Sequence, residues 1–260
     1  MFLPWDVRNI IFTYIAFSGR LQHKLRGHTN EVYCIGMLPN GWAVSGCLDK
    51  TLRLWDLSIG DCKRVPQGHI GRVLCLCVLP AGRVVSGSSD RTLRTWDPVS
   101  GACEQVLQGH AGDIVCVSVL PNKRIVSASR DNTLRVWDPS TGACEQVLKG
   151  HTEYVTSLGV LPGGRVVSTS FDTTLRIWNP STGACEQVLE GHTGEVHRMS
   201  MLPDKRIVSG SCDNTLRIWN PSTGACEQVL KGHISVISCL VAVPYTHLTL
   251  PTIHSVYTAV

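Results

Sequence analysis

Several familiar signals are missing from this sequence of 260 residues. No apolar run is long enough to cross a bilayer, so we expect no membrane partner. Only 17% of the residues are charged while 43% are hydrophobic, which excludes a disordered chain. The net charge is a mild +4, and no basic cluster is interleaved with aromatic residues, so the sequence does not favour binding to nucleic acid.

The sequence does contain one unit that is repeated several times. Gly-His pairs recur every 41 residues, beginning at positions 27, 68, 109, 150, 191 and 232. A tryptophan and an aspartate keep the same step through five units, and they fall at Trp55, Trp96, Trp137, Trp178 and Trp219, and at Asp49, Asp90, Asp131, Asp172 and Asp213. A period of about 20–50 residues indicates stacked supersecondary units rather than one irregular core.

Each unit reads as four short strands. In the second unit the apolar and β-branched runs are residues 72–80 (RVLCLCVLP), 83–88 (RVVSGS), 92–96 (TLRTW) and 103–107 (CEQVL). Turn-forming residues such as Pro, Gly, Ser and Asp separate these runs, and no stretch has helical spacing. We therefore expect an all-β protein.

The Gly-His…Trp-Asp pattern, with four strands in each unit, resembles the WD-repeat family. The resemblance extends from about Leu21 to Pro244. It implies a β-propeller, in which four-stranded antiparallel blades surround a central channel. We expect five complete blades and a partial one, which form an incomplete ring, and we interpret the chain as a fragment of a propeller with six or seven blades.

In that family a His, a second-strand Ser, the Asp of the following turn and the third-strand Trp form a hydrogen-bonded group within each blade. The matching sets here are His28, Ser45, Asp49, Trp55; His69, Ser86, Asp90, Trp96; His110, Ser127, Asp131, Trp137; His151, Ser168, Asp172, Trp178; and His192, Ser209, Asp213, Trp219. A catalytic triad uses the same residue types. Five copies at blade spacing instead indicate a repeated structural group, so we expect no catalytic residue.

Twelve cysteines are present, but their spacing predicts neither a metal site nor disulfides. No Cys-x-x-Cys pair occurs, and a single residue separates Cys75 from Cys77. Five other cysteines recur every 41 residues in the fourth strand, where the ring should hold them apart: Cys62, Cys103, Cys144, Cys185 and Cys226. We therefore expect no cofactor and no metal, and so many unpaired thiols indicate an intracellular location, cytoplasmic or nuclear.

The two ends of the chain depart from the repeat. Residues 21–25 match the fourth strand of the other units and should complete a blade whose other strands come from the C-terminus. Residues 236–243 supply only a first strand, and the repeat stops at Pro244. The segment Tyr245–Thr252 (YTHLTLPT) resembles a translated sequencing-library adapter. We therefore divide the chain into a non-repeat segment at 1–20, a WD-repeat propeller at 21–244 and an adapter-derived tail at 245–260.

Residues 1–20 are open to two interpretations. The apolar pattern from Leu3 to Ile15 resembles the opening of an F-box, which docks a substrate receptor on a ubiquitin-ligase scaffold. The segment is shorter than an F-box, so the other interpretation is an amphipathic helix that packs on the propeller.

The units differ from one another mainly on one face. That face should carry the loop before the first strand and the turn between the second and third strands. The loops of the other face are nearly identical, and PSTGACEQ occurs three times. Recognition requires different groups at different places, although drift at exposed loops is the alternative explanation. The predicted partner-binding residues are Glu31, Tyr33, Leu48, Arg72, Leu74, Ser89, Asp113, Arg130, Tyr154, Phe171, Glu195 and His197.

The sequence thus predicts a non-catalytic scaffold that binds a protein or peptide. One alternative is a substrate receptor of an F-box-type ubiquitin ligase. A second alternative is a propeller enzyme, which requires an unrepeated cluster of carboxylates, histidines or metal ligands. Glu31, Asp113 and Glu195 come nearest to such a cluster, and we do not expect them to bind metal.

Overall fold

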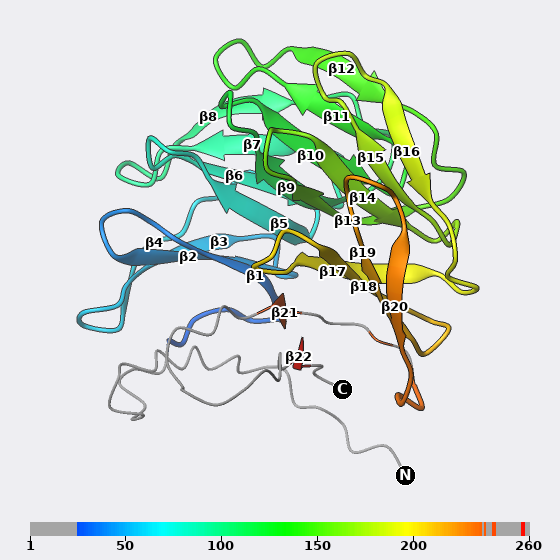
Figure 1. Ribbon diagram of the computed structural model, residues 1–260. Coiled ribbons are helices and arrows are strands. Elements are labelled where there is room, and N and C mark those ends of the chain that lie inside the picture. Colours follow the sequence, from blue (N-terminus) through cyan, green and yellow to red (C-terminus); the bar gives the residue numbers. More distant parts are fainter. Residues whose placement is uncertain (1–24, 236, 238–240, 243–255, 258–260) are drawn as a thin grey trace. The chain divides into compact units, whose positions relative to one another are not determined.

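The computed structural model describes residues 25–235, 237, 241–242 and 256–257, and in this part of the chain every regular element is a β-strand (Figure 1). Contacts divide the chain into two compact units. One comprises Met1–Val119 and Asp138–Ala143, and the other comprises Leu120–Trp137 and Cys144–Val260. Among the described residues, no helix is long and apolar enough to cross a membrane.

The repeats form five four-stranded sheets in which consecutive strands are neighbours. The first sheet contains β1 (Val32–Met37), β2 (Trp42–Cys47), β3 (Leu52–Asp56) and β4 (Asp61–Arg64). The second contains β5 (Val73–Val78), β6 (Val84–Ser88), β7 (Leu93–Trp96) and β8 (Cys103–Leu107). The third contains β9 (Ile114–Val119), β10 (Ile125–Ser129), β11 (Leu134–Trp137) and β12 (Cys144–Leu148).

The fourth sheet contains β13 (Val155–Val160), β14 (Val166–Ser170), β15 (Leu175–Trp178) and β16 (Cys185–Leu189). The fifth contains β17 (Val196–Met201), β18 (Ile207–Ser211), β19 (Leu216–Trp219) and β20 (Cys226–Leu230). The strands of the fourth and fifth sheets all pair in antiparallel fashion. These sheets confirm the predicted all-β fold of four-stranded blades.

The second and third strands of each repeat carry the core. All five residues of β14 are buried, as are those of β18. The indole of Trp219, in the fifth sheet, packs in one cluster with Val167 and Ile177, which belong to the fourth sheet. The third-strand tryptophan therefore fills the space between neighbouring sheets, where a large apolar ring excludes the most water.

The turn between the second and third strands has a fixed backbone conformation in every repeat. The residue after its aspartate has a positive φ, and these residues are Lys50 (70°), Arg91 (67°), Asn132 (67°), Thr173 (69°) and Asn214 (63°). Asparagine tolerates this left-handed conformation, whereas a β-branched residue crowds its own backbone there. The fourth repeat thus holds the least suitable residue of the five.

Replacement of Thr173 by asparagine is expected to raise the free energy of unfolding by about 1 kcal/mol, because it relieves this crowding. Urea denaturation of the variant and of the unaltered chain measures the change. The fifth repeat offers the reciprocal control, since Asn214→Thr should lower the free energy of unfolding by a similar amount. Equal stabilities for all three chains would contradict the strain argument.

Most of the two chain ends lies outside the described residues. This applies to the possible F-box or helix at 1–20 and to the expected fourth strand at 21–25, of which only Leu25 is described. Leu25 is buried against Ala43 and Trp55. Near the C-terminus, β21 (Val241–Ala242) pairs in antiparallel fashion with β22 (Val256–Tyr257), so two residues of the predicted tail pair with residues assigned to the partial blade.

Candidate functional site

Hydrogen bonds join the residues of the predicted structural sets. In the fourth repeat Trp178 Nε1 donates to Ser168 Oγ (2.8 Å), and Ser168 Oγ lies 2.7 Å from His151 Nε2. His151 Nδ1 lies 2.6 Å from Asp172 Oδ2. A carboxylate can only accept, so Nδ1 carries the imidazole proton and Nε2 accepts from the serine hydroxyl. We call this chain of hydrogen bonds, which leads from the indole through the serine and the histidine to the carboxylate, the brace.

The brace recurs with little change in the first, second and fifth repeats. The distance from His Nε2 to Ser Oγ is 2.7–2.8 Å, and the distance from His Nδ1 to Asp Oδ2 is 2.7–2.9 Å. In the third repeat Trp137 Nε1 donates to Ser127 Oγ at 2.8 Å. All five brace serines have no exposed surface, so their hydroxyls cannot reach a substrate, and the arrangement is structural.

A threonine belongs to each brace, although the sequence analysis did not single it out. Its Oγ1 donates to Asp Oδ1 at 2.6–2.7 Å in every repeat. The five residues are Thr51, Thr92, Thr133, Thr174 and Thr215. They keep the 41-residue step, so the period itself was a signal that could have identified them.

The brace holds its titratable groups in fixed charge states. Burial alone raises the pKa of Asp172, but hydrogen bonds from His151 and Thr174 outweigh this effect and hold the pKa well below its ordinary value. Burial lowers the pKa of His151, and the bond to Asp172 offsets this only in part. At neutral pH the brace therefore contains an ionised carboxylate and a neutral imidazole.

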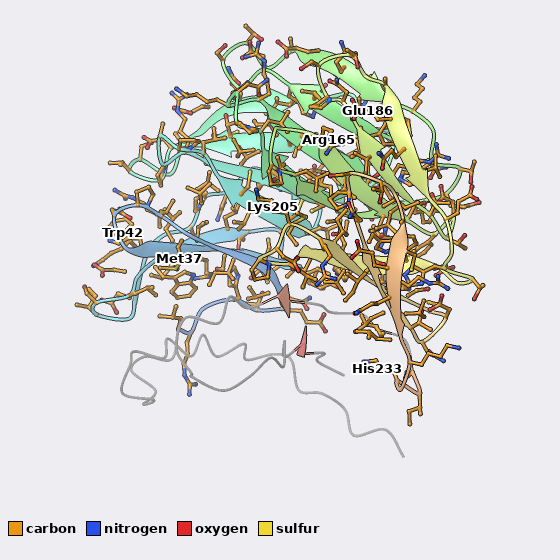
Figure 2. The ribbon with its side chains drawn as sticks, in the orientation of Figure 1. Met37, Trp42, Arg165, Glu186, Lys205 and His233 are labelled. Carbon is orange, nitrogen blue, oxygen red and sulfur yellow. The ribbon has the colours of Figure 1, made fainter. Side chains whose placement is uncertain are left out.

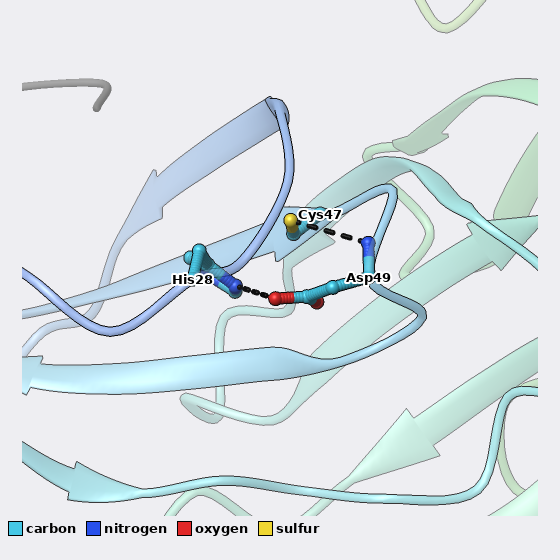
Figure 3. Close-up of side chains that lie close together, drawn as sticks. All are labelled: His28, Cys47 and Asp49. Carbon is cyan, nitrogen blue, oxygen red and sulfur yellow. Dashed lines mark hydrogen bonds and ion pairs between the residues drawn. The ribbon is translucent and has the colours of Figure 1, made fainter. Parts of the chain in front are cut away.

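The first repeat brings a cysteine close to its brace. Figure 3 shows Cys47 beside His28 and Asp49, three residue types that can bind a metal. Cys47 Sγ donates to Asn30 O (3.1 Å) and accepts from Asp49 N (3.3 Å). In the fourth repeat Ser170 makes the equivalent two bonds. Both ring nitrogens of His28 are already bonded, one to Asp49 and the other to the brace serine Ser45. Cys47 therefore lies beside an intact brace, in the place that Ser170 has in the fourth repeat.

In four repeats a backbone hydrogen bond joins the loop before the first strand to the turn between the second and third strands. Phe171 N donates to Tyr154 O (3.0 Å), and Cys212 N donates to Glu195 O (2.8 Å). The first two repeats have the same bond, from Leu48 N to Glu31 O and from Ser89 N to Arg72 O, both at 2.9 Å. The varied positions of a repeat therefore share one end of its sheet.

The predicted partner-binding residues differ in exposure. The exposed ones are Tyr33, Arg72, Arg130, Tyr154 and Glu195. The half-buried ones are Glu31, Leu48, Leu74, Ser89, Asp113, Phe171 and His197. Their role in binding stays a prediction.

Tyr154, Phe171 and His197 form an aromatic patch. The ring centroids of Tyr154 and Phe171 are 6.0 Å apart, and those of Phe171 and His197 are 5.2 Å apart in an edge-to-face arrangement. The patch extends from the fourth repeat to the fifth. Tyr154 is 46% exposed, so its ring is available to a partner.

The opposite end of the sheets carries ion pairs, each between an arginine just before a second strand and a glutamate near the start of a fourth strand. Arg165 Nη1 lies 3.8 Å from Glu186 Oε2, and both residues are labelled in Figure 2. Arg83 with Glu104, Arg124 with Glu145, and Arg206 with Glu227 repeat this pair at 3.0, 2.6 and 3.2 Å. Such exposed pairs contribute little to stability. This end presents the same charges in successive repeats, in contrast to the varied end.

Comparison with known proteins agrees with this geometry. Segments of the chain match two curated proteins: 56 residues are 38% identical to autophagy-related protein 16 of Arabidopsis thaliana, and 48 residues are 42% identical to U3 small nucleolar RNA-associated protein 21 of Saccharomyces cerevisiae. These segments are 21% and 18% of this chain, and they span only 11% and 5% of the two relatives.

A family profile covers far more of the chain. The profile described as "WD domain, G-beta repeat" matches residues 19–56, 60–97, 101–138, 142–179 and 183–220. Each matched segment ends one residue after the brace tryptophan of its repeat. Proteins with these repeats are generally non-catalytic scaffolds for protein interaction. With five matched repeats, five four-stranded sheets and a recurring brace, this chain belongs to the WD-repeat family.

Proposed function

We propose that the chain is a non-catalytic platform that binds a protein or peptide through the varied ends of its sheets. The aromatic patch of Tyr154, Phe171 and His197 carries this proposal. Aromatic side chains contribute much of the free energy of many interfaces, because they bury a large area with few rotatable bonds. The intracellular location is part of the same proposal, since the fourth-strand cysteines are free thiols.

The contrast between the two ends of the sheets supports this choice of surface. Ion pairs recur at one end, whereas at the other Tyr154 corresponds to Arg72 of the second repeat and to Glu195 of the fifth. A surface that must recognise one partner needs such differences, and a surface that only stabilises the fold does not. The names of the two relatives refer to different processes, so the proposal concerns the binding surface and not a pathway.

The test exchanges patch residues for those that other repeats hold at the same positions. The variant Tyr154→Glu with Phe171→Ser has the residue types that occur at the equivalent positions of other repeats, Glu195 in the fifth and Ser89 in the second. Its sheet should therefore stay folded. We expect this variant to retain fewer proteins from an extract of cells that express the chain, with at least about a tenfold loss for each specific partner. Quantitative mass spectrometry of the retained proteins measures the difference.

The matched control removes an ion pair from the opposite end of the sheet. Arg165→Ala with Glu186→Ala also changes two exposed or half-buried residues of the fourth repeat, yet it should leave the retained proteins unchanged. If the control loses the same proteins as the patch variant, or if the patch variant loses none, the proposed surface is wrong.

A further inference from the structure

One group of side chains in the fifth repeat combines three kinds of metal ligand. Glu195 lies just before β17, His197 is the second residue of that strand, and Cys212 follows β18. His197 Nε2 is 3.0 Å from Cys212 Sγ and 3.6 Å from Glu195 Oε2. Cys212 Sγ is 3.9 Å from Glu195 Oε2. A nitrogen, a sulfur and an oxygen thus form a closed triangle.

The backbone holds this triangle in place. Cys212 N donates to Glu195 O, which ties the two loops together. The register of β17 against β18 shifts between Val196 and Arg198, so His197 is the extra residue of a bulge. A bulge redirects the side chain of its extra residue. The Phe171 ring also packs against the imidazole, with the ring centroids 5.2 Å apart and the planes inclined at 64°.

We propose that Glu195, His197 and Cys212 bind one zinc-type divalent cation, with a fourth position open to water. Tetrahedral zinc takes thiolate, imidazole and carboxylate ligands at about 2.0–2.3 Å, which places ligand atoms roughly 3.3–3.6 Å from one another. The observed separations of 3.0, 3.6 and 3.9 Å bracket that range, so small side-chain rotations suffice. The proposal does not rest on the proposed function, although His197 also belongs to the aromatic patch, because cation binding is measured on the chain alone.

The surroundings suit a bound cation. The side chains of His197 and Glu195 are 28% and 47% exposed, so an ion can enter from solvent. Binding of the cation displaces the proton of the Cys212 thiol to water. The nearby guanidinium of Arg198 donates to Thr156 O (3.3 Å).

The other repeats do not hold this combination of side chains. The residues at the three positions are Glu31, Tyr33, Leu48; Arg72, Leu74, Ser89; Asp113, Val115, Arg130; and Tyr154, Thr156, Phe171. None of these sets has a second zinc ligand. The sequence analysis expected no metal because the spacing of the cysteines matches no metal motif, and it weighed Glu195 as a ligand only together with Glu31 and Asp113 of other repeats. The fold instead places it beside His197 and Cys212.

Cobalt(II) is the probe, because a cobalt–thiolate bond gives an intense charge-transfer absorption in the near ultraviolet. The full chain is reduced, freed of metal and mixed with one equivalent of Co²⁺. We expect the absorption in the unaltered chain, and we expect Zn²⁺ to abolish it by displacement. Cys212→Ser, which introduces the residue type that the second repeat has at the equivalent position (Ser89), should lose the absorption. His197→Thr, which carries the residue of Thr156, should lower zinc affinity in a chelator competition by more than about 100-fold.

The control is Cys47→Ser, which removes a different thiol and carries the serine that the other repeats have at this position. It should keep both the absorption and the zinc affinity of the unaltered chain. The proposal is overturned if the unaltered chain gives no absorption, if Cys212→Ser keeps it, or if Cys47→Ser loses it equally, which would indicate binding by thiols in general. Far-ultraviolet circular dichroism of each variant checks that its sheets remain folded.

Discussion

Replacement of Trp178 by alanine is expected to lower the free energy of unfolding by about 3–5 kcal/mol. The indole has no exposed surface, so its removal leaves a large cavity in the buried core beside the fourth sheet. The same change removes the donor to Ser168 Oγ. Urea denaturation followed by far-ultraviolet circular dichroism measures the loss, because that signal reports the sheets and not the missing indole.

Trp178→Phe separates the two contributions. Phenylalanine fills most of the cavity but has no N–H group, so the buried Ser168 hydroxyl loses one bond. We expect this variant to lose only about 1–3 kcal/mol. Equal losses for the two variants would mean that the hydrogen bond, and not the packing of the ring, accounts for the stabilising effect of Trp178.

The repeat predicts the fold well for a physical reason. A residue that recurs every 41 positions occupies the same site in each sheet, so every copy supports the same interpretation. The brace of His151, Ser168, Asp172 and Trp178 is one such case. The sequence analysis linked these residues to one another by resemblance to the family, and their hydrogen bonds lie at 2.6–2.8 Å.

The same logic explains what could not be predicted. His197 and Cys212 break the period, so no other copy indicates what they contact. They are 15 residues apart in the sequence, and His197, the extra residue of a bulge in β17, has its Nε2 3.0 Å from Cys212 Sγ. A shift of register by one residue is not visible in a strand pattern of alternating residues. The contact between Phe171 and His197 is equally hidden, because it joins two repeats.

Replacement of Asp172 by alanine is expected to cost about 3–5 kcal/mol of unfolding free energy, because it leaves a buried group of donors without an acceptor. The Asp172 carboxylate accepts from His151 Nδ1, from the backbone N–H of Thr152, and from both the N–H and the hydroxyl of Thr174. The control is Asp97→Asn, at a turn where the fourth repeat already has Asn179. It should change stability by less than about 0.5 kcal/mol.

The pH dependence of this loss identifies its cause. The pKa of Asp172 is well below its ordinary value in the folded chain and about 3.9 when unfolded, so the unfolded chain takes up the proton first on acidification. The stabilising contribution is therefore complete above about pH 5 and declines as the pH falls below about 4. The difference in stability between the unaltered chain and Asp172→Ala should shrink over that acidic range. A difference that stays constant down to pH 3 would show that Asp172 acts through packing and not through its charge.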